Sequence, residues 1–302
     1  MNLSDLKYLI AVAEHRHFGH AADECNISQP TLSTQLKKLE AELGVALLER
    51  TNRSVSVTDA GEQVLRHARN ILAEADMIRQ VGSDESRPMS GHLRIGCIPT
   101  LAPYMLPWLL PALVADYPDL IPVLVEDMTA HLTESLINHD LDVGFMALPL
   151  DGDELATEAL FDESFLVACH PDHPFAATEA VLRQQLAEED VLYLDDGHCM
   201  RDQTMEICGR PSSGGLGGDF RAASLETLRQ LVKAGFGVTL LPAMAVSGSN
   251  HDGRIAIRPF AGPAFRRVGA VWRKSFPRPD DIRLLCQTVR RAAPGVVSLI
   301  DD

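Results

Sequence analysis

Apolar residues at helical spacing predict a series of helices in the first part of the chain. The first helix begins near Ser4, whose side chain is suited to capping it, and a short second helix contains Ala21 and Ala22. Ser28 is expected to cap a third helix that ends near Leu43. A short alanine-containing helix, a tight turn and a polar-faced helix are typical of a helix-turn-helix, whose second helix enters the major groove of DNA.

The third helix carries polar side chains opposite an inner stripe of leucines, and these polar groups can bond base edges or phosphates. We predict that the following residues of this helix contact DNA: Gln29, Pro30, Thr31, Ser33, Thr34 and Lys37. Residues 47–57 then read as a strand, a basic turn and a second strand, a wing that directs Arg50 and Arg53 at the DNA backbone or minor groove. Any one of these polar residues alone is more simply explained as part of a solvent-exposed helix face. Their order along the chain favours DNA binding.

Thr58 can cap a long helix that reaches about Ser83. Its apolar residues alternate spacings of four and three, as in the seam of a coiled coil: Val64, Ala68, Ile71, Ala75 and Ile78. At about 1.5 Å per residue the helix is roughly 40 Å long, enough to separate a DNA-binding head from the body. We expect this seam to form a dimer; the alternative is that it packs on its own head.

Beyond residue 88 short apolar runs alternate with helical segments. The predicted strands are 93–98, 123–126, 142–148, 165–169, 191–194 and 237–241. The predicted helices are 102–116, 129–139, 224–234 and 280–293. This alternation predicts parallel sheets in two lobes with a ligand cleft at the strand ends.

We therefore expect an α/β chain in three parts. Residues 1–58 form a winged helix-turn-helix, residues 59–87 a linker helix for dimerisation, and residues 88–302 a two-lobed, Rossmann-like regulatory domain of the periplasmic-binding-protein type.

Charge and cysteine content narrow the function further. The 302-residue chain has a formal net charge of −15, but residues 1–87 hold 10 basic against 13 acidic side chains, so the acidity is mostly elsewhere. No apolar run approaches the ~18 residues of a membrane span. Six cysteines without dense spacing fit a reducing cytoplasm. His15, His17 and His20 lack a partner at metal-ligand spacing, so we expect neither a metal site nor a cofactor.

Two cysteines carry the candidate chemistry. Cys199 lies between His198 and Arg201, and a cationic neighbour favours the reactive thiolate. If Asp202 caps a helix that contains Cys208, the two sulfurs are on the order of 10 to 15 Å apart. A disulfide, which needs Cα atoms within roughly 7 Å, then requires that segment to unwind, and the glycine-rich run 212–218 can accommodate the change. Two inert cysteines are the alternative.

The run FGHAADECNISQPTLSTQLKKLEAELGVALLERTNRSVSVTDAG resembles the DNA-binding region of the LysR-type transcriptional regulators. The segments GCIPT from residue 96, LDDGHCMRDQ from residue 194 and FRAASLETLR from residue 220 are similar to the OxyR branch of that family. The resemblance implies that the chain crosses between lobes near Asp162 and Arg267. Lobe I then comprises about 90–162 and 268–302, and lobe II about 163–267.

The resemblance also implies a chemistry for the cleft. Thr100, Thr129, His198 and Arg267 form a peroxide pocket around Cys199, with the adjacent Arg266 as the alternative to Arg267, and the cation at Arg201 is added to this set. Peroxide oxidises Cys199 to a sulfenic acid, which condenses with the resolving Cys208 into a disulfide.

The expected function is therefore a hydrogen-peroxide-sensing transcriptional regulator, and not an enzyme, that controls antioxidant genes. Expected partners are promoter DNA, a second copy through the linker helix, a tetramer of such dimers and RNA polymerase. Two alternatives stay open: a LysR-type regulator that responds to a small organic effector, and a thiol peroxidase. The DNA-reading head disfavours the peroxidase.

Overall fold

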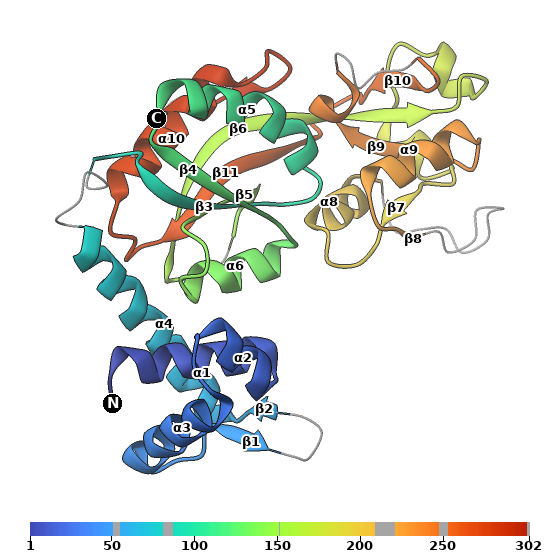
Figure 1. Cartoon of the computed structure of the whole chain (residues 1–302). Helices are drawn as coiled ribbons and strands as arrows, with labels where there is room; N and C mark the ends of the chain where they lie inside the picture. The colour runs from blue at the N-terminus through green and yellow to red at the C-terminus, as the bar shows by residue number, and fades with distance from the viewer. Residues whose placement is uncertain (51–54, 81–86, 151, 209–220, 248–252, 301–302) are drawn as a thin grey trace. The chain divides into compact units, whose positions relative to one another are not determined.

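The computed structural model describes residues 1–302 except 51–54, 81–86, 151, 209–220, 248–252 and 301–302. The chain divides into two compact units, drawn in Figure 1. One comprises Met1–Arg87 with Asn138–Asp140, and the other Pro88–Ile137 with Leu141–Asp302. The predicted α/β class with an N-terminal helix-turn-helix is confirmed.

The first unit is a winged helix-turn-helix followed by a long helix. Its elements are α1 (Leu3–His15), α2 (Phe18–Glu24), α3 (Gln29–Leu43), β1 (Leu48–Arg50), β2 (Val55–Val57) and α4 (Asp59–Gln80). Ser28 caps α3 as predicted, because its side chain accepts from the Thr31 amide. The prediction that Ser4 caps α1 is wrong: Asn2 does so, in a reciprocal capping box with Asp5.

Helix α4 divides into two parts by burial. Thr58 accepts a hydrogen bond from the Gly61 amide at 2.9 Å and so caps it as predicted. Val64, the first residue of the predicted seam, packs against the core of the head, and Ala68, the second, is buried. Further along, Ile71 and Ile78 are 41% and 75% exposed. The beginning of the apolar stripe therefore packs on its own head, and the later part remains accessible.

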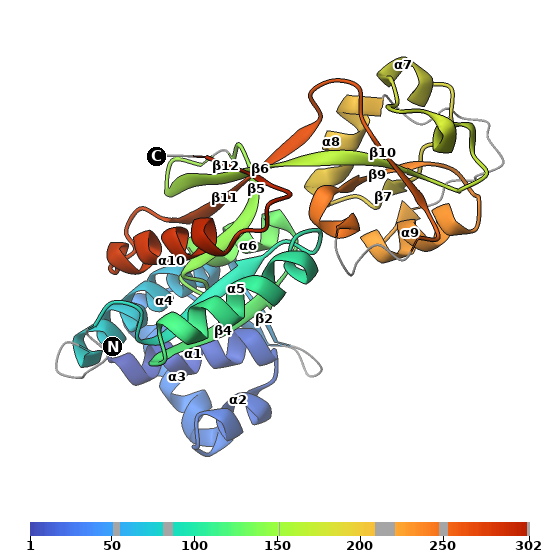
Figure 2. The same ribbon diagram turned by 90° about the horizontal axis from the view of Figure 1, so that it is seen from above.

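Lobe I of the second unit is a sheet covered by helices on both faces (Figures 1 and 2). Strands β3 (Gly91–Cys97), β4 (Leu120–Glu126) and β5 (Val143–Leu148) are parallel to one another. Helices α5 (Ala102–Asp116) and α10 (Pro279–Ala292) pack together on one face, and α6 (Thr129–Ile137) lies on the other. Cys286 of α10 is buried in the lobe I core, so the last helix returns to this lobe.

Two long antiparallel strands join the lobes, which corrects the expectation of purely parallel sheets. Strand β6 (Leu155–Cys169) pairs antiparallel with β11 (Phe265–Arg273), and β11 pairs antiparallel with β5. Phe161 belongs to the core of lobe I and Phe165, four residues later, to the core of lobe II. The strand predicted at 165–169 is thus the last third of one continuous 15-residue strand.

Lobe II is built on the far ends of these two strands. Strands β9 (Thr239–Pro242) and β10 (Ala256–Pro259) pair antiparallel with β6, and β7 (Tyr193–Leu194) pairs parallel with β8 (Arg221–Ala222). The remaining elements are α7 (Arg183–Leu186), α8 (Cys199–Cys208), α9 (Leu225–Lys233), the short β12 (Ser298–Leu299) of lobe I, and two 3-10 helices, η2 (Pro174–Ala177) and η3 (Ala243–Val246). None of the helices in the described part of the chain combines the length and apolar character needed to span a membrane.

Candidate functional site

Cys199 and Cys208 are the first and last residues of the same helix, α8. The prediction that Asp202 caps this helix is wrong by four residues, because the helix begins at Cys199 and the chain enters it directly from the turn at Gly197, whose φ is +94°. Nine residues of α-helix separate the two cysteines by roughly 13.5 Å along the axis. Both thiols are free. A bond between them requires α8 to unwind, because a disulfide joins Cα atoms no more than about 7 Å apart.

Cys199 lies where the two lobes meet. Its side chain is half-buried and packs against the core of lobe I, although α8 belongs to lobe II. The turn before it also approaches lobe I, since a Cβ added at Gly197 would lie 3.9 Å from Met128 Cγ. Met128 immediately precedes α6 and Thr129. A sulfur at a helix N-terminus also lies near amide groups that stabilise negative charge.

Arg266, and not Arg267, reaches the predicted pocket. The buried Arg266 donates from Nη1 to Thr100 Oγ1 at 2.9 Å and from Nη2 to the Thr100 carbonyl at 3.1 Å. Arg267 lies on the opposite face of β11, 47% exposed, and pairs with Asp162 at 2.8 Å. The prediction of Arg267 as a pocket residue is therefore wrong, because successive side chains of a strand point to opposite faces.

Glu163 is the partner that makes the buried arginine possible. Arg266 Nε donates to Glu163 Oε2 at 2.8 Å, and both side chains are 0% exposed. The other carboxylate oxygen accepts from the Met244 amide at 2.8 Å. Because Arg266 and Glu163 are register partners on β11 and β6, this ion pair lies where the chain crosses between the lobes. Glu163 was not among the residues predicted from the sequence; the signal for it was an acidic pair at 162–163 and a basic pair at 266–267.

His198 is a neutral acceptor and not the cation that the sequence suggested. Its side chain is 4% exposed, and burial lowers its pKa, opposed by a hydrogen bond to the Ala223 backbone and by the charge of Asp195. Nδ1 is buried and has no hydrogen-bond partner among the described residues. The bond to Ala223 then uses Nε2, which leaves Nδ1 free to accept a proton.

Arg201 is also in a different environment from the one predicted. Its Nη1 donates to the Leu194 carbonyl at 2.9 Å, and its Nε lies 3.2 Å from Asp196. These contacts hold the turn before α8. The expectation of Arg201 as a pocket residue is therefore corrected: its charge is already compensated by Asp196.

Two hydroxyl groups complete the geometry on the lobe I side. Thr100 is 2% exposed, and because its oxygen accepts from Arg266, its proton is available to another acceptor. Thr129 is the first residue of α6, and its buried Oγ1 has no partner in the described part of the chain. A buried polar atom without a partner is costly unless a small ligand or water binds it.

Cys208 differs sharply from Cys199 in its surroundings. It is 4% exposed within the lobe II core, and burial raises the pKa of its thiol to about 12, with the nearby Arg183 acting in the opposite direction. Cys97, Cys169 and Cys286 are also buried, as expected for structural cysteines.

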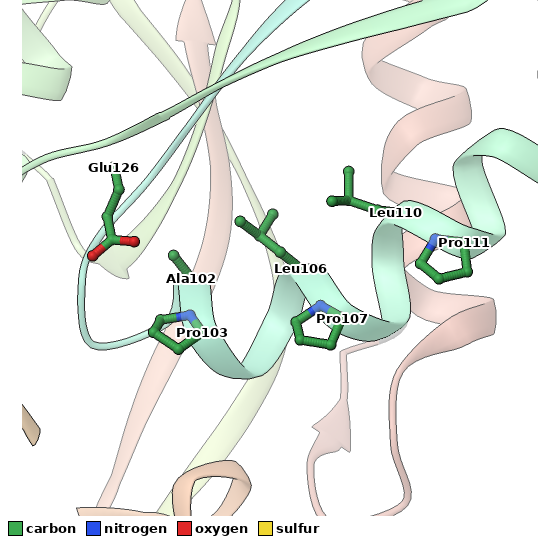
Figure 3. A pocket seen from close by; sticks show the side chains of 7 residues that line it. All are labelled: Ala102, Pro103, Leu106, Pro107, Leu110, Pro111 and Glu126. Atoms are coloured by element: carbon green, nitrogen blue, oxygen red, sulfur yellow. The ribbon is translucent and has the colours of Figure 1, made fainter. Parts of the chain in front are cut away.

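An apolar groove on α5 is separate from these residues (Figure 3). It has a volume of about 410 Å³ and is lined by Ala102, Pro103, Leu106, Pro107, Leu110, Pro111 and Glu126. Glu126 is its one charged side chain, and it contains none of the predicted pocket residues.

In the head, most of the predicted DNA-contacting side chains of α3 are accessible. Gln29, Pro30, Thr31, Thr34 and Lys37 are exposed, and Ser33 is half-buried. The Thr34 hydroxyl donates to the Pro30 carbonyl at 2.8 Å. Arg53 and the side chain of Arg50 lie outside the described residues.

Comparison with known proteins gives matches over almost the whole chain. The family model of bacterial regulatory helix-turn-helix proteins of the lysR family matches residues 3–62, and that of the LysR substrate binding domain matches residues 86–294. The DNA-binding transcriptional dual regulator OxyR of Escherichia coli K12 is 44% identical, over 98% of this chain and 97% of that protein.

Two solved structures extend the comparison to three dimensions. Full-length OxyR from Pseudomonas aeruginosa, a cysteine-to-aspartate variant, is 36% identical with a TM-score of 0.83, covering 100% of this chain and 98% of that one. A cysteine variant of OxyR from Corynebacterium glutamicum, described as H2O2-bound, is 38% identical with a TM-score of 0.66, covering 96% and 92%.

Proposed function

Because the chain belongs to the LysR family of bacterial transcriptional regulators, and within it to the OxyR group, we propose that it senses hydrogen peroxide through Cys199. The observation that carries the proposal is the position of this thiol. It lies at the N-terminus of α8, between the lobes, with the unpartnered His198 Nδ1 in the residue before it and Met128, the residue before Thr129, beside the adjoining turn.

The first step is a two-electron transfer from sulfur to peroxide. The Cys199 thiolate attacks one peroxide oxygen, the O–O bond breaks, and the departing hydroxide takes a proton and leaves as water. Before the attack, His198 Nδ1 accepts the proton of the Cys199 thiol. Thr100 donates its hydroxyl proton to a peroxide oxygen, since Arg266 occupies an acceptor site of that hydroxyl.

In the second step the sulfenic acid at Cys199 condenses with the thiol of Cys208. The S–S bond forms as the S–O bond breaks, and the hydroxyl leaves with the Cys208 proton as water. Because the two residues are at opposite ends of α8, condensation requires the helix to unwind. The chemical change thereby becomes a change of shape, which is what a regulator transmits.

The output is a change in promoter binding. Regulators of this family bind DNA through the helix-turn-helix and form oligomers. We assign dimerisation to the accessible part of α4, and we expect a tetramer that contacts RNA polymerase in the cytoplasm. Within α3 we assign base and phosphate contacts to Gln29, Thr31 and Lys37.

One experiment tests this function against its alternatives. The purified protein is treated with one equivalent of peroxide, its disulfides are mapped by mass spectrometry, and its DNA footprint is measured before and after. We expect a Cys199–Cys208 bond and an altered footprint. Alkylatable thiols with an unchanged footprint contradict peroxide sensing and favour an organic effector, and sustained peroxide consumption without DNA binding indicates a thiol peroxidase.

Cysteine variants refine this experiment. Cys199→Ser should bind DNA with the reduced footprint and ignore peroxide. Cys169→Ala is the matched control, because Cys169 is a buried cysteine of the same lobe that takes no part in the proposed chemistry. A normal peroxide response of the Cys199→Ser protein contradicts the assigned role.

A further inference from the structure

We infer that Arg183 is a positioning residue for the disulfide step: it holds the C-terminal turn of α8 and thereby stabilises the reduced conformation in which Cys208 is withdrawn from Cys199. The guanidinium of Arg183 donates from Nη2 to the backbone carbonyl of Glu206, two residues before Cys208. This inference rests on the proposed function, since it concerns the equilibrium between thiols and disulfide.

The Arg183 bond satisfies a group that the helix itself leaves unpaired. The last four carbonyls of an α-helix have no amide partner within the helix, and Glu206 is in the last turn of α8, which ends at Cys208. A cation at this end is also favourable for the helix dipole. Arg183 therefore stabilises α8 in two ways, as a donor and as a charge.

The position of Arg183 is fixed by a short helix of its own. Arg183 is the first residue of α7, which packs against α8. Leu186, the last residue of α7, is buried in the same core as Cys208 and Met200 of α8. The backbone of α7 is therefore anchored beside the helix that must unwind, while the arginine side chain reaches across its surface.

The stabilisation applies to one redox state only. To join Cys199, Cys208 must come about 6 Å or more closer along the helix axis, so the turn that contains Glu206 must open. The carbonyl that accepts from Arg183 then leaves its helical position. The Arg183 bond thus favours the dithiol over the disulfide, and its removal should favour oxidation.

The test measures the equilibrium with glutathione, in which the protein disulfide and two reduced glutathione molecules exchange with the protein dithiol and glutathione disulfide. Full-length wild-type protein and Arg183→Met are equilibrated over a range of glutathione ratios, and the oxidised fraction is measured after alkylation. The oxidation constant of Arg183→Met should rise about two- to five-fold, the range for a cation at a helix C-terminus. This corresponds to a reduction potential about 10 to 20 mV more negative.

Two further variants separate positioning from general destabilisation. Arg258→Met also removes an arginine bond to a backbone carbonyl in lobe II, that of Ala176, but away from α8, and its constant should equal that of wild type. Arg183→Lys keeps a cation without the planar fork and should fall between wild type and Arg183→Met.

The outcomes are distinct from those of the proposed function. If the Cys199–Cys208 bond forms and Arg183→Met has the wild-type constant, or a lower one, the inference is overturned while peroxide sensing stands. An increase of the same size in Arg258→Met also overturns it. If wild-type protein forms no such bond at any glutathione ratio, both the proposed function and the inference are lost.

Discussion

Arg266 donates a hydrogen bond to the hydroxyl of Thr100 at 2.9 Å, across 166 positions of sequence. Arg266 is on a strand that crosses between the lobes, and Thr100 follows the first strand of lobe I. The bond places a buried cation beside a hydroxyl without exposing the charge, since Glu163 compensates it. Variants of Thr100 and Arg266 therefore test the proposed site directly.

Thr100→Val removes the hydroxyl and keeps the shape of the side chain. We expect the rate of Cys199 oxidation by peroxide to fall on the order of 10- to 100-fold, because one oriented proton donor is removed. Competition kinetics with a known thiol peroxidase measures this rate. Thr239→Val is the control, because its buried hydroxyl donates to the Leu192 carbonyl. Like the loss of the Thr100 hydroxyl, this change should lower the free energy of unfolding by about 1–3 kcal/mol, but it should not slow oxidation.

Arg266 and Arg267 should differ strongly in their contribution to stability. Arg266→Met leaves Glu163 buried without its ion partner and should lower the free energy of unfolding by roughly 3–5 kcal/mol. Arg267→Met breaks a solvent-exposed pair with Asp162 and should leave the free energy of unfolding nearly unchanged. Urea unfolding measures the loss of stability in each variant. Equal losses contradict the burial of the Arg266–Glu163 ion pair.

His198 should make stability depend on pH in a defined direction. Burial lowers its folded-state pKa below the value of about 6.5 in the unfolded chain, so the unfolded chain binds the proton more readily. Above about pH 6.5 the ring is neutral in both states, so His198 does not make the free energy of unfolding depend on pH. As the pH falls below about 6.5, the unfolded chain takes up the proton first and stability is progressively lost.

Urea unfolding at pH 7.5 and 5.5 measures this effect. His198→Gln removes the titrating group, so the wild type should lose more stability between these two pH values than the variant does. An equal loss in both proteins indicates that His198 binds its proton as readily in the folded state as in the unfolded chain.

The accessible apolar residues of α4 should control association. Ile78→Lys places a charge in the proposed seam, where each of two copies otherwise buries an isoleucine worth about 1.5 kcal/mol. The dimer dissociation constant should rise more than about 100-fold, as measured by sedimentation equilibrium. Val45→Lys, at a position 44% exposed in the head, should leave association unchanged; a dimer that survives Ile78→Lys is held elsewhere.

Lys37 on α3 should contribute to DNA binding through phosphate. Lys37→Ala should weaken binding to all sequences alike and reduce the slope of log affinity against log salt by about 0.9 for each phosphate that the lysine no longer neutralises. Lys7→Ala, on the exposed side of α1, is the control. A decrease in affinity confined to one base pair of the operator contradicts the phosphate role.

The sequence by itself determined the local elements and the residue types that do the chemistry. Ser28 and Thr58 cap their helices as expected from side chains that accept amide protons within a few residues, and such interactions are encoded locally. The helical character of the segment that ends at Cys208 followed from the same local signals, although the helix begins four residues earlier than predicted and so includes Cys199.

Only the tertiary structure decided which charges reach the site and which are compensated elsewhere. Arg266 and Arg267 are equivalent in sequence, and their roles diverge because the register of β11 against β6 buries one face and exposes the other. Burial lowers the pKa of His198 and so favours its neutral form, and Arg201 pairs with Asp196 and the Leu194 carbonyl and not with a thiol. Burial and long-range pairing depend on residues far apart in the chain, which no local pattern specifies.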